Sequence, residues 1–450
     1  METTQFNVKE SIELLSELIQ NKCVNPPGNE MKSIKTVERF LEEHNVKSQI
    51  FESETNRGNL VARILGTKNG PKLMFGPSHV DVVPVENPEA WQVDPFSGIV
   101  KEDHVWGRGA LDMLYIVVTQ VQAFCKLVEE NFQPKGDLIL LIVSDEEAGG
   151  TYGAEWMLKH HPDLVKTDYL VTEAGGISLA PNRIAVMNGE KGGSSTRISF
   201  KGTPGHGSMP YGSDNATTKV AEAIKHLSNF NPEIITEYLG HVAQGMRLGR
   251  IQSIMLTNKT LLPLSLSNLK KRNPQMAKVM HGLSRMTLSP NIVHGGSKVN
   301  VIAAKAHVDV DIRTLPGQDE EYVINQLNKA LGPLAKEATI EFLSGEEGGI
   351  ISFGNASPAS SEFVNMMEKA IQQSGLPEAT LVPFIMPAVS DCRFFRNLGV
   401  DAYGFSLFDP NTPMNHLANL AHGTDERIGI KTLELSQKAY YNLAKIFNGN

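Results

Sequence analysis

The amino-acid sequence predicts an α/β fold, in which a mixed, largely parallel sheet is flanked by helices and interrupted by a smaller α+β domain. Three observations support this prediction. Short apolar runs alternate with helical patterns up to about residue 175, as in sheets whose two faces are covered by helices. Near residue 190 strands of alternating polarity replace them, and after about residue 345 the first pattern returns. We therefore expect one discontinuous domain, residues 1–190 and 346–450, and one inserted domain, residues 191–345.

The amino-terminal part is expected to alternate helices with buried strands. Apolar residues at helical spacing, such as Ile12 and Leu15, predict a helix over residues 7–21, which the segment NPPGNE (25–30) separates from the next one. Further helices are predicted over residues 31–44 and 115–130. Apolar runs predict strands over residues 59–65, 72–83, 138–144 and 168–174.

The inserted and closing parts have patterns of their own. In the insertion, strands are predicted over residues 194–202 and 304–313, a helix over 216–230, and helical stretches such as 274–286 within a long segment at 233–290. The closing part is expected to form helices over residues 360–375 and 431–447 and strands over residues 381–386 and 400–406.

Composition describes an ordinary globular protein with a net negative charge. Of the 450 residues 41% are hydrophobic and 20% are charged, and the formal net charge is -8. This charge argues against a phosphate-binding surface, so we expect neither nucleic acid nor a membrane as a partner. The amino terminus lacks the layout of a secretory signal, and no apolar run approaches the ~20 residues that span a bilayer. A cytoplasmic location is therefore expected, with Cys23, Cys125 and Cys392 as buried, unpaired side chains.

Histidine and acidic residues lie at or just after the ends of several predicted strands, where open α/β sheets place their ligands. They are His79 and Asp81 in GPSHVDVVP, Asp112 in GRGALDM, Glu146 and Glu147 in SDEEAGG, Glu173 in VTEAGG, and His422 in LAHGTDER. Singly, each has a structural interpretation: His79 also fits a capped core histidine, and Asp112 fits a helix N-cap. Together they form a set of nitrogen and oxygen ligands suited to Zn²⁺. Two metal ions ~3.5 to 4 Å apart would supply the cation that the clustered acids of SDEEAGG require.

The order of these motifs resembles that of a known enzyme family. GPSHVDVVP is followed by WQVDPFSGIVKEDHVWGRGALDM, SDEEAGG, TEAGG, GTPGHGSMP, SDCRFF and AHGTDER. This order is similar to that of the dizinc aminoacylase and carboxypeptidase family, which includes acetylornithine deacetylase and succinyl-diaminopimelate desuccinylase. The resemblance runs from NPPGNE nearly to the carboxyl terminus and includes the inserted domain. It implies that residues 1–190 and 346–450 form the catalytic, metal-binding domain.

The resemblance implies five metal ligands around two ions. His79 and Glu173 would bind one zinc ion, Glu147 and His422 would bind the other, and Asp112 would bridge both. A cis peptide bond is implied after this bridging aspartate, between Asp112 and Met113.

The neighbours of these ligands would have supporting roles. Glu146 would be the general base that takes a proton from the water between the metals and passes it to the leaving nitrogen. Adjacent side chains of an extended segment diverge, so Glu146 and Glu147 are not expected to bind one ion in the same way. Asp81 would accept a hydrogen bond from the second ring nitrogen of His79 and so fix the orientation of this ligand.

In the inserted domain, GTPGHGSMP matches the family's lid segment. The resemblance implies that His206 reaches into the active site of a partner subunit and helps to polarise the scissile carbonyl. A homodimer would then be the working form, and residues 191–345 would be a lid and dimerisation domain. Asn300 in KVNVIAA matches an oxyanion or substrate contact.

Two arginines keep alternative interpretations. Arg313 matches a further lid position but could equally pair with Asp309 or Asp311. Arg393 in SDCRFF could bind a substrate carboxylate, or it could form a structural ion pair with Asp391.

The implied activity is cleavage of the amide bond of a small N-acyl amino acid or dipeptide. A metal-bound hydroxide would attack the carbonyl carbon while Glu146 manages the proton. The metal is expected to be Zn²⁺, although Co²⁺ and Mn²⁺ share much of this ligand preference. Two alternatives stay open, an exopeptidase acting on longer peptides and a catalytically silent scaffold of the same fold.

Three departures from the family pattern concern the surroundings of the site. Leu114 and Tyr115 follow the aspartate motif where lysine and glycine are usual, and Ala303 takes the place of the usual proline after NVI. The segment 233–290 exceeds the compact lid of smaller members, which makes the chain more similar to the larger aminoacylases and carboxypeptidases. All five implied ligands are present, so these departures affect the substrate wall rather than the metal site.

Overall fold

Two units make up the chain in the computed structural model, which describes residues 6–345 and 351–448. Unit 1 comprises Met1–Asn188, Ser357–Phe384 and Ser390–Asn450, and unit 2 comprises Gly189–Ala356 and Ile385–Val389. The second boundary predicted from the sequence, at 345/346, adjoins residues 346–350, which lie outside the described residues.

Unit 1 is built on a mixed sheet whose central strands are parallel. The parallel strands are, in order, β6 (Leu138–Val143), β3 (Leu73–His79), β7 (Tyr169–Thr172) and β16 (Asp401–Gly404). Antiparallel strands extend the sheet: β1 (Ser48–Glu54) and β2 (Arg57–Ile64) beyond β6, and β9 (Arg183–Glu190) beyond β16. The last two residues of β9, Gly189 and Glu190, already belong to unit 2 and pair there with β14 (Asn355–Ala356). Strands β8 (Ser178–Ala180) and β15 (Thr380–Met386) also pair with β9. Every residue of β3 and β6 is buried, as expected of parallel strands covered on both faces. The predicted α/β class is confirmed.

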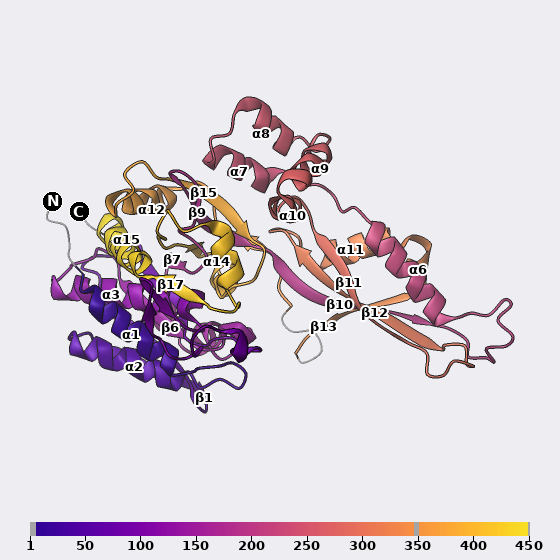
Figure 1. Cartoon of the computed structure of the whole chain (residues 1–450), viewed down its shortest axis with the longest axis horizontal. Helices are drawn as coiled ribbons and strands as arrows, with labels where there is room; N and C mark the ends of the chain where they lie inside the picture. Colours follow the sequence, from indigo (N-terminus) through magenta and orange to yellow (C-terminus); the bar gives the residue numbers. More distant parts are fainter. Residues whose placement is uncertain (1–5, 346–350, 449–450) are drawn as a thin grey trace. The chain divides into compact units, whose positions relative to one another are not determined.

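The long helices of unit 1 pack in two groups that α3 joins. They are α1 (Val8–Gln20), α2 (Met31–Glu43), α3 (Tyr115–Glu129), α12 (Glu362–Gln373) and α15 (Ile430–Asn448). Helices α1, α2 and α3 contact one another, and α15 packs against both α3 and α12 (Figure 1). Within the described residues one helical stretch, Ala110–Glu129, is long and apolar enough to cross a membrane, but 83% of its most apolar window is buried. This stretch has the burial of a core helix.

Shorter elements complete unit 1. Helices α4 (Ala154–His160), α5 (Pro162–Val165), α13 (Cys392–Arg396) and α14 (Met414–Leu420) lie between the strands in sequence. A small sheet has the order β17 (Arg427–Gly429), β5 (His104–Trp106) and β4 (Val100–Lys101). Helical turns occur at Pro88–Ala90, Ala110–Leu114 and Glu146–Ala148.

Unit 2 is an α+β structure around a four-stranded antiparallel sheet. The strand order is β11 (Thr287–Gly295), β12 (Lys305–Thr314), β10 (Gly192–Lys201) and β13 (Ala338–Leu343). Helix α6 (Ala216–Asn229) packs on this sheet and α11 (Glu320–Leu331) packs on α6, with a helical turn following at Gly332–Lys336. The segment predicted to be helical in patches forms α7 (Glu237–Gly245), α8 (Arg250–Thr257), α9 (Leu262–Arg272) and α10 (Pro274–Gly282).

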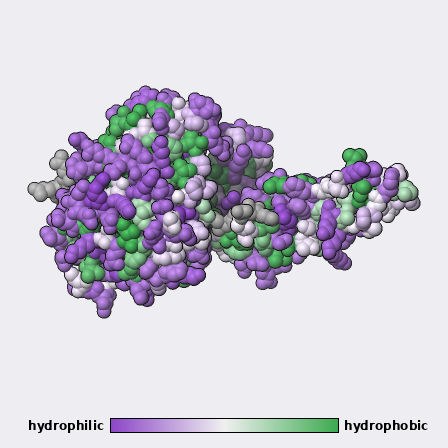
Figure 2. Space-filling model, turned by 90° about the horizontal axis from the view of Figure 1, so that it is seen from below, coloured by the Kyte–Doolittle hydropathy of each residue, from purple (hydrophilic) through white to green (hydrophobic). Residues whose placement is uncertain are grey.

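The surface carries many polar side chains (Figure 2), and the cysteines lie in the interior. On the face drawn in Figure 2, hydrophilic side chains predominate and hydrophobic ones are scattered among them. Cys23, Cys125 and Cys392 are buried and free, as the sequence predicts.

Candidate metal centre

The carboxyl ends of the parallel strands position three of the expected ligands. His79 is the last residue of β3, Glu173 directly follows β7, and Glu147 lies in the helical turn after β6. Because β6, β3 and β7 are parallel neighbours, these three side chains come to the same edge of the sheet. Asp112 arrives from the turn Ala110–Leu114 before α3, and His422 from the loop after α14.

The five side chains converge within unit 1 in two groups that share Asp112. The groups are His79, Asp112 and Glu173, and Asp112, Glu147 and His422, and the ligand atoms of each group lie within 4.8 Å of one another. The two Asp112 oxygens face different histidines: Oδ1 lies 3.5 Å from His79 Nε2, and Oδ2 lies 3.1 Å from His422 Nε2. His422 Nε2 is also 3.2 Å from Glu147 Oε1, and His79 Nε2 is 3.9 Å from Glu173 Oε2.

The donor atoms fit a pair of divalent metal ions. His79 Nε2 and Glu147 Oε1 are buried and make no hydrogen bond within the described residues, so both are left as potential ligand atoms. His79 Nδ1 lies 3.0 Å from the backbone carbonyl of Asp81, which fits a proton on Nδ1 and leaves Nε2 free to bind a cation. Imidazole nitrogens with carboxylate oxygens and no thiolate are the ligands that Zn²⁺ and similar ions use in catalytic sites.

The shifted pKa values of the clustered acidic side chains also indicate a site for cations. Burial and the charge of Glu173 raise the pKa of Glu146 well above its usual range, and burial and the charge of Asp112 do the same to the pKa of Glu173. Contact with Asp112 and Glu147 raises the pKa of His422 to about 10. A pair of dications would reverse this balance, because it favours ionised carboxylates and neutral imidazoles.

The carboxylate of Asp81 makes closer contacts with the backbone of the site than with the imidazole ring of His79. Its carboxylate lies 3.5 Å from His79 Nδ1, which is longer than the contact of that nitrogen with the Asp81 carbonyl. The same carboxylate accepts hydrogen bonds from the backbone N–H groups of Glu146, at 3.2 Å, and Glu147, at 3.1 Å. Asp81 therefore connects the end of β3 to the turn after β6.

The backbone around the acidic residues differs from the sequence expectation in one respect. Glu146–Ala148 is a 3₁₀ turn and not an extended segment, because Asp145 before it and Gly149 after it adopt left-handed conformations with φ of 75° and 116°. The two glutamates still diverge: Glu147 lies beside His422, while Glu146 Oε2 lies 3.9 Å from His79 Nε2. The expected cis peptide bond between Asp112 and Met113 is confirmed.

A buried ion pair that the sequence interpretation missed connects two of the ligand loops. Arg108 Nη1 lies 2.6 Å from Glu426 Oε2, and Arg108 Nη2 donates to the carbonyl of His422 at 3.2 Å. Glu426 Oε1 accepts from the N–H groups of Leu111, at 2.9 Å, and Asp112, at 3.1 Å. Both residues lie inside motifs named in the sequence analysis: Arg108 in GRGALDM and Glu426 in AHGTDER. Their pairing is visible only in the fold.

Arg393 is buried and engaged by its own unit. Its guanidinium donates to the carbonyls of Ser390 and Gly149, each at 2.7 Å, and lies 3.9 Å from Asp391. These contacts are closer to the structural role left open from the sequence than to an arginine free to bind a substrate carboxylate. They also fix the backbone of Gly149, next to the turn Glu146–Ala148. Both carboxylate oxygens of Asp391 are buried without a hydrogen bond in the described part of the chain.

Within unit 2, the structure places His206 and Asn300 together. Residues His206 and Val301 form an isolated antiparallel bridge, and Gly207 N–H donates to the Asn300 carbonyl at 2.8 Å. His206 is exposed, with Nδ1 2.7 Å from Ser208 Oγ. Arg313 Nε donates to Asp311 at 3.0 Å, which is one of the two ion pairs left open from the sequence.

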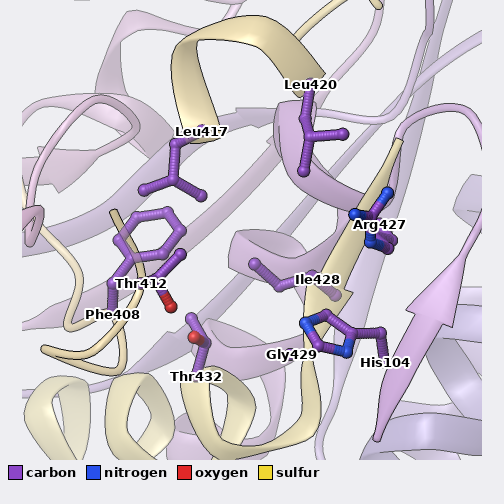
Figure 3. A pocket seen from close by; sticks show the side chains of 9 residues that line it. All are labelled: His104, Phe408, Thr412, Leu417, Leu420, Arg427, Ile428, Gly429 and Thr432. Atoms are coloured by element: carbon purple, nitrogen blue, oxygen red, sulfur yellow. The ribbon is translucent and has the colours of Figure 1, made fainter. Parts of the chain in front are cut away.

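A small pocket in unit 1 is formed by other residues. Its walls include His104, Phe408, Leu417, Leu420 and Thr432 (Figure 3). Its cavity volume of about 10 Å³ leaves room for about one water molecule. This pocket is too small for an organic substrate, and none of the candidate ligands lines it.

A shared carboxylate between two histidine-containing ligand groups, set at the ends of parallel strands, is typical of dinuclear metallohydrolases. The chain belongs to Peptidase family M20/M25/M40, whose sequence pattern matches residues 77–446. The resemblance drawn from the motifs is thereby confirmed. The protein is a metal-dependent hydrolase of C–N amide or peptide bonds.

Individual relatives agree with this class. The "Probable carboxypeptidase S-like 2" of Dictyostelium discoideum is 27% identical over 386 residues, which are 83% of this chain and 71% of that protein. Aminoacylase-1 of the same organism is 25% identical over 449 residues, which are 98% of this chain and 96% of that protein. The solved structure of the M20 family metallo-carboxypeptidase Sso-CP2 from Sulfolobus solfataricus has a TM-score of 0.69 at 18% identity, and covers 98% of this chain and 99% of that chain. The structural likeness shows a common fold.

Proposed function

We propose that the protein hydrolyses the amide bond of small N-acyl amino acids or dipeptides at a pair of Zn²⁺ ions. One ion would be held by His79 and Glu173, the other by Glu147 and His422, and Asp112 would bridge the two. The observation that carries this proposal is the position of Asp112, whose two oxygens face His79 and His422 separately. The donor set also suits Co²⁺ and Mn²⁺, so metal reconstitution is part of the test.

The residues of unit 1 divide the work of hydrolysis. When bound, the metal ions supply polarisation of the carbonyl and a lower pKa for the attacking water. Glu146 lies beside the ligands, with Oε2 3.9 Å from His79 Nε2, and would accept the proton of the attacking water and deliver it to the leaving nitrogen. Asp81 accepts a hydrogen bond from the backbone N–H of Glu146 and would thereby keep the Glu146 carboxylate in position.

Residues of unit 2 would complete the site in a homodimer. His206 of one chain would help to polarise the scissile carbonyl bound by its partner, and Asn300 would contact the substrate or its oxyanion. Arg313 would be a further substrate-binding residue, and Arg393 would bind a substrate carboxylate. Each arginine would first have to release its present partners, which are Asp311 for Arg313 and the carbonyls of Ser390 and Gly149 for Arg393. We further propose that the enzyme works in the cytoplasm, consistent with its three free, buried cysteines.

A second candidate, an exopeptidase acting on longer peptides, is favoured by one observation. The relative with 27% identity is a probable carboxypeptidase S-like protein. A panel of N-acyl amino acids, dipeptides and longer peptides, assayed with the zinc-reconstituted protein, distinguishes the two candidates by which class has the highest kcat/KM. A silent scaffold would hydrolyse none of them.

The substitution Glu146→Gln tests the mechanism. It removes the proton acceptor and leaves all five ligands in place, so we expect kcat to fall by about 10²–10⁴-fold while metal content stays full. Glu155→Gln, a change of an exposed glutamate on α4, is the matched control and should leave kcat unchanged. Full turnover by the Glu146→Gln variant would remove Glu146 from this role.

A further inference from the structure

The segment NPPGNE, to which the proposed mechanism gives no role, contacts the residues that support the Glu146–Glu147 turn. Asn25 Nδ2 donates to Asp81 Oδ2 at 2.8 Å and to Asp145 Oδ1 at 3.2 Å. Glu30, at the other end of the segment, lies 2.8 Å from Arg57 Nε. All of these side chains are buried in unit 1.

Arg57 of β2 is the centre of this arrangement. Each nitrogen of its guanidinium faces a different acceptor: Nε faces Glu30, Nη1 donates to the carbonyl of Pro27 at 3.2 Å, and Nη2 lies 2.5 Å from Asp145 Oδ1. Gly28 permits this close packing, because a Cβ at that position would lie 2.5 Å from Arg57 Cζ. A lysine could not make the same three contacts, since its charge is a single point on a flexible stem.

Asp145 transmits these contacts to the acidic turn. It directly precedes Glu146 in a left-handed conformation, φ 75° and ψ 10°, which aspartate adopts more readily than most residues, and its carboxylate is held by Arg57 and Asn25. Its second oxygen, Oδ2, accepts from Tyr152 N–H at 2.9 Å, so one carboxylate fastens both ends of the loop over 145–152. Asp81, joined to Asp145 through Asn25, accepts from the N–H groups of Glu146 and Glu147.

We propose that Arg57 and Asn25 are positioning residues that act on the metal site through Asp145 and Asp81. They fix the backbone of the Glu146–Glu147 turn and so determine the affinity for the ion that Glu147 binds and the alignment of Glu146. The statement about metal affinity rests on the proposed function, whereas the statement about the backbone of the turn does not. The first ligand group contains no residue of this turn and should be affected less.

The first experiment measures zinc affinity. Metal-free wild-type protein and the variants Arg57→Met, Arg57→Lys and Asn25→Ala are titrated with Zn²⁺ against a chromophoric chelator that resolves the two equivalents. We expect Arg57→Met to weaken one equivalent by about 10–100-fold, the effect typical of residues that orient metal ligands, and to leave the other near its wild-type value. Arg57→Lys should have a smaller effect, and kcat should fall in the same order while KM changes little.

Arg63→Met is the matched control. Arg63 lies on the same strand and also pairs with an aspartate, Asp137, but neither residue contacts the acidic turn. It should lose an ion pair on the same strand, although a less buried one, without a change in either zinc equivalent. If Arg57→Met weakens both equivalents equally, or no more than Arg63→Met does, its role is only structural and the proposal is overturned.

A second experiment decides the proposal without metal. Amide hydrogen exchange of the metal-free protein reports the N–H groups of Glu146, Glu147 and Tyr152, which donate to Asp81 and Asp145. We expect their exchange to be at least about tenfold faster in Asn25→Ala and Arg57→Lys, with amides of the central strands unchanged. Unchanged exchange at the turn would overturn the proposal. Failure of the wild-type protein to bind two ions would instead count against the proposed function, and the exchange result would still stand.

Discussion

Asp112 is the residue on which both ligand groups depend. Because Oδ1 faces His79 and Oδ2 faces His422, replacing Asp112 by alanine would remove a proposed ligand from each of the two proposed ions. We expect Asp112→Ala to weaken both zinc equivalents by more than about 100-fold, beyond the range for residues that only orient ligands. Glu173→Ala should weaken one equivalent and Glu147→Ala the other. Metal content per chain after dialysis, with chelator competition for the affinities, measures all three variants.

The test depends on how many zinc ions each variant loses, compared across the three variants. Asp163→Ala, which changes an exposed aspartate of unit 1, should retain both ions and serves as the control. A shared ligand predicts that Asp112→Ala affects two ions and each glutamate variant only one. If Asp112→Ala lost a single ion, the bridging assignment would be wrong.

The candidate ligands could be predicted from the sequence, while the residues that hold them could not. His79, Asp112, Glu147, Glu173 and His422 lie in motifs whose spacing and order are visible along the chain. Arg57 and Asp145 are 88 residues apart and Arg108 and Glu426 are 318 apart, so no local pattern pairs them. In the sequence, a buried arginine that forms ion pairs also cannot be distinguished from an exposed polar residue in an otherwise apolar strand. Contacts of this kind are properties of the fold rather than of any segment.

Lys191, at the junction of β9 and β10, provides a test of pH dependence that does not involve metal. Its Nζ donates to the carbonyls of Gly282, at 2.8 Å, and Arg285, at 3.0 Å, at the carboxyl end of α10. Burial, with a contribution from the charge of Arg313, lowers the pKa of Lys191 to about 7. Cationic side chains are favourable at helix carboxyl ends, but this one is almost wholly withdrawn from water.

The sign of the expected effect follows from proton binding. Between pH 7 and about 10.4, the usual lysine pKa, the unfolded chain holds a proton on Lys191 that the folded chain has lost, so the stability of unit 2 rises with pH. One such group contributes a slope of up to about 1.4 kcal/mol per pH unit. Lys191→Met should remove this slope, as followed by urea unfolding monitored through amide exchange in β10 and β12. Lys201→Met, an exposed lysine at the end of β10, should leave the slope intact. An unchanged slope in Lys191→Met would show that Lys191 stays protonated in the folded state.

The elements differ in how well the sequence predicts them, and burial explains the difference. Strands β3 and β6 and helices α1, α2 and α15 were predicted within a few residues, because long apolar periodicities set their positions. In the segment 233–290 only helical patches could be predicted: α8 buries none of its residues fully, so it leaves almost no periodic signal. The 3₁₀ turn at Glu146–Ala148 was missed for another reason, since a left-handed aspartate has no marker comparable to glycine.

The way unit 2 is inserted into the chain follows from one short strand pair. Glu190 is paired with Asn355, and Gly189 with Ala356, in the antiparallel ladder of β9 and β14. Directly opposed residues of such a ladder have Cα atoms about 4.5–5.5 Å apart. The chain therefore enters and leaves the main segment of unit 2 at neighbouring residues, while the short segment Ile385–Val389 belongs to unit 2 separately. The five candidate metal ligands all belong to unit 1. The change in strand pattern near residues 190 and 345 predicts an insertion, but the adjacency of its ends is visible only in the strand register.

This adjacency allows most of unit 2 to be removed by design. Replacing residues 191–354 with Asn-Gly would join Glu190 to Asn355 through a two-residue hairpin turn, the connection that suits an antiparallel pair. We expect the shortened chain to fold and to bind two metal ions, since the cluster and the buried pairs of Arg57 and Arg108 remain. Hydrolysis should be lost, because His206, Asn300 and Arg313 are removed. Circular dichroism, metal content and the substrate panel measure these three outcomes, with the same deletion carrying Glu146→Gln as the baseline for residual turnover. A folded but metal-free product would mean that unit 2 supports the metal site, and undiminished hydrolysis would exclude the proposed roles of its three residues.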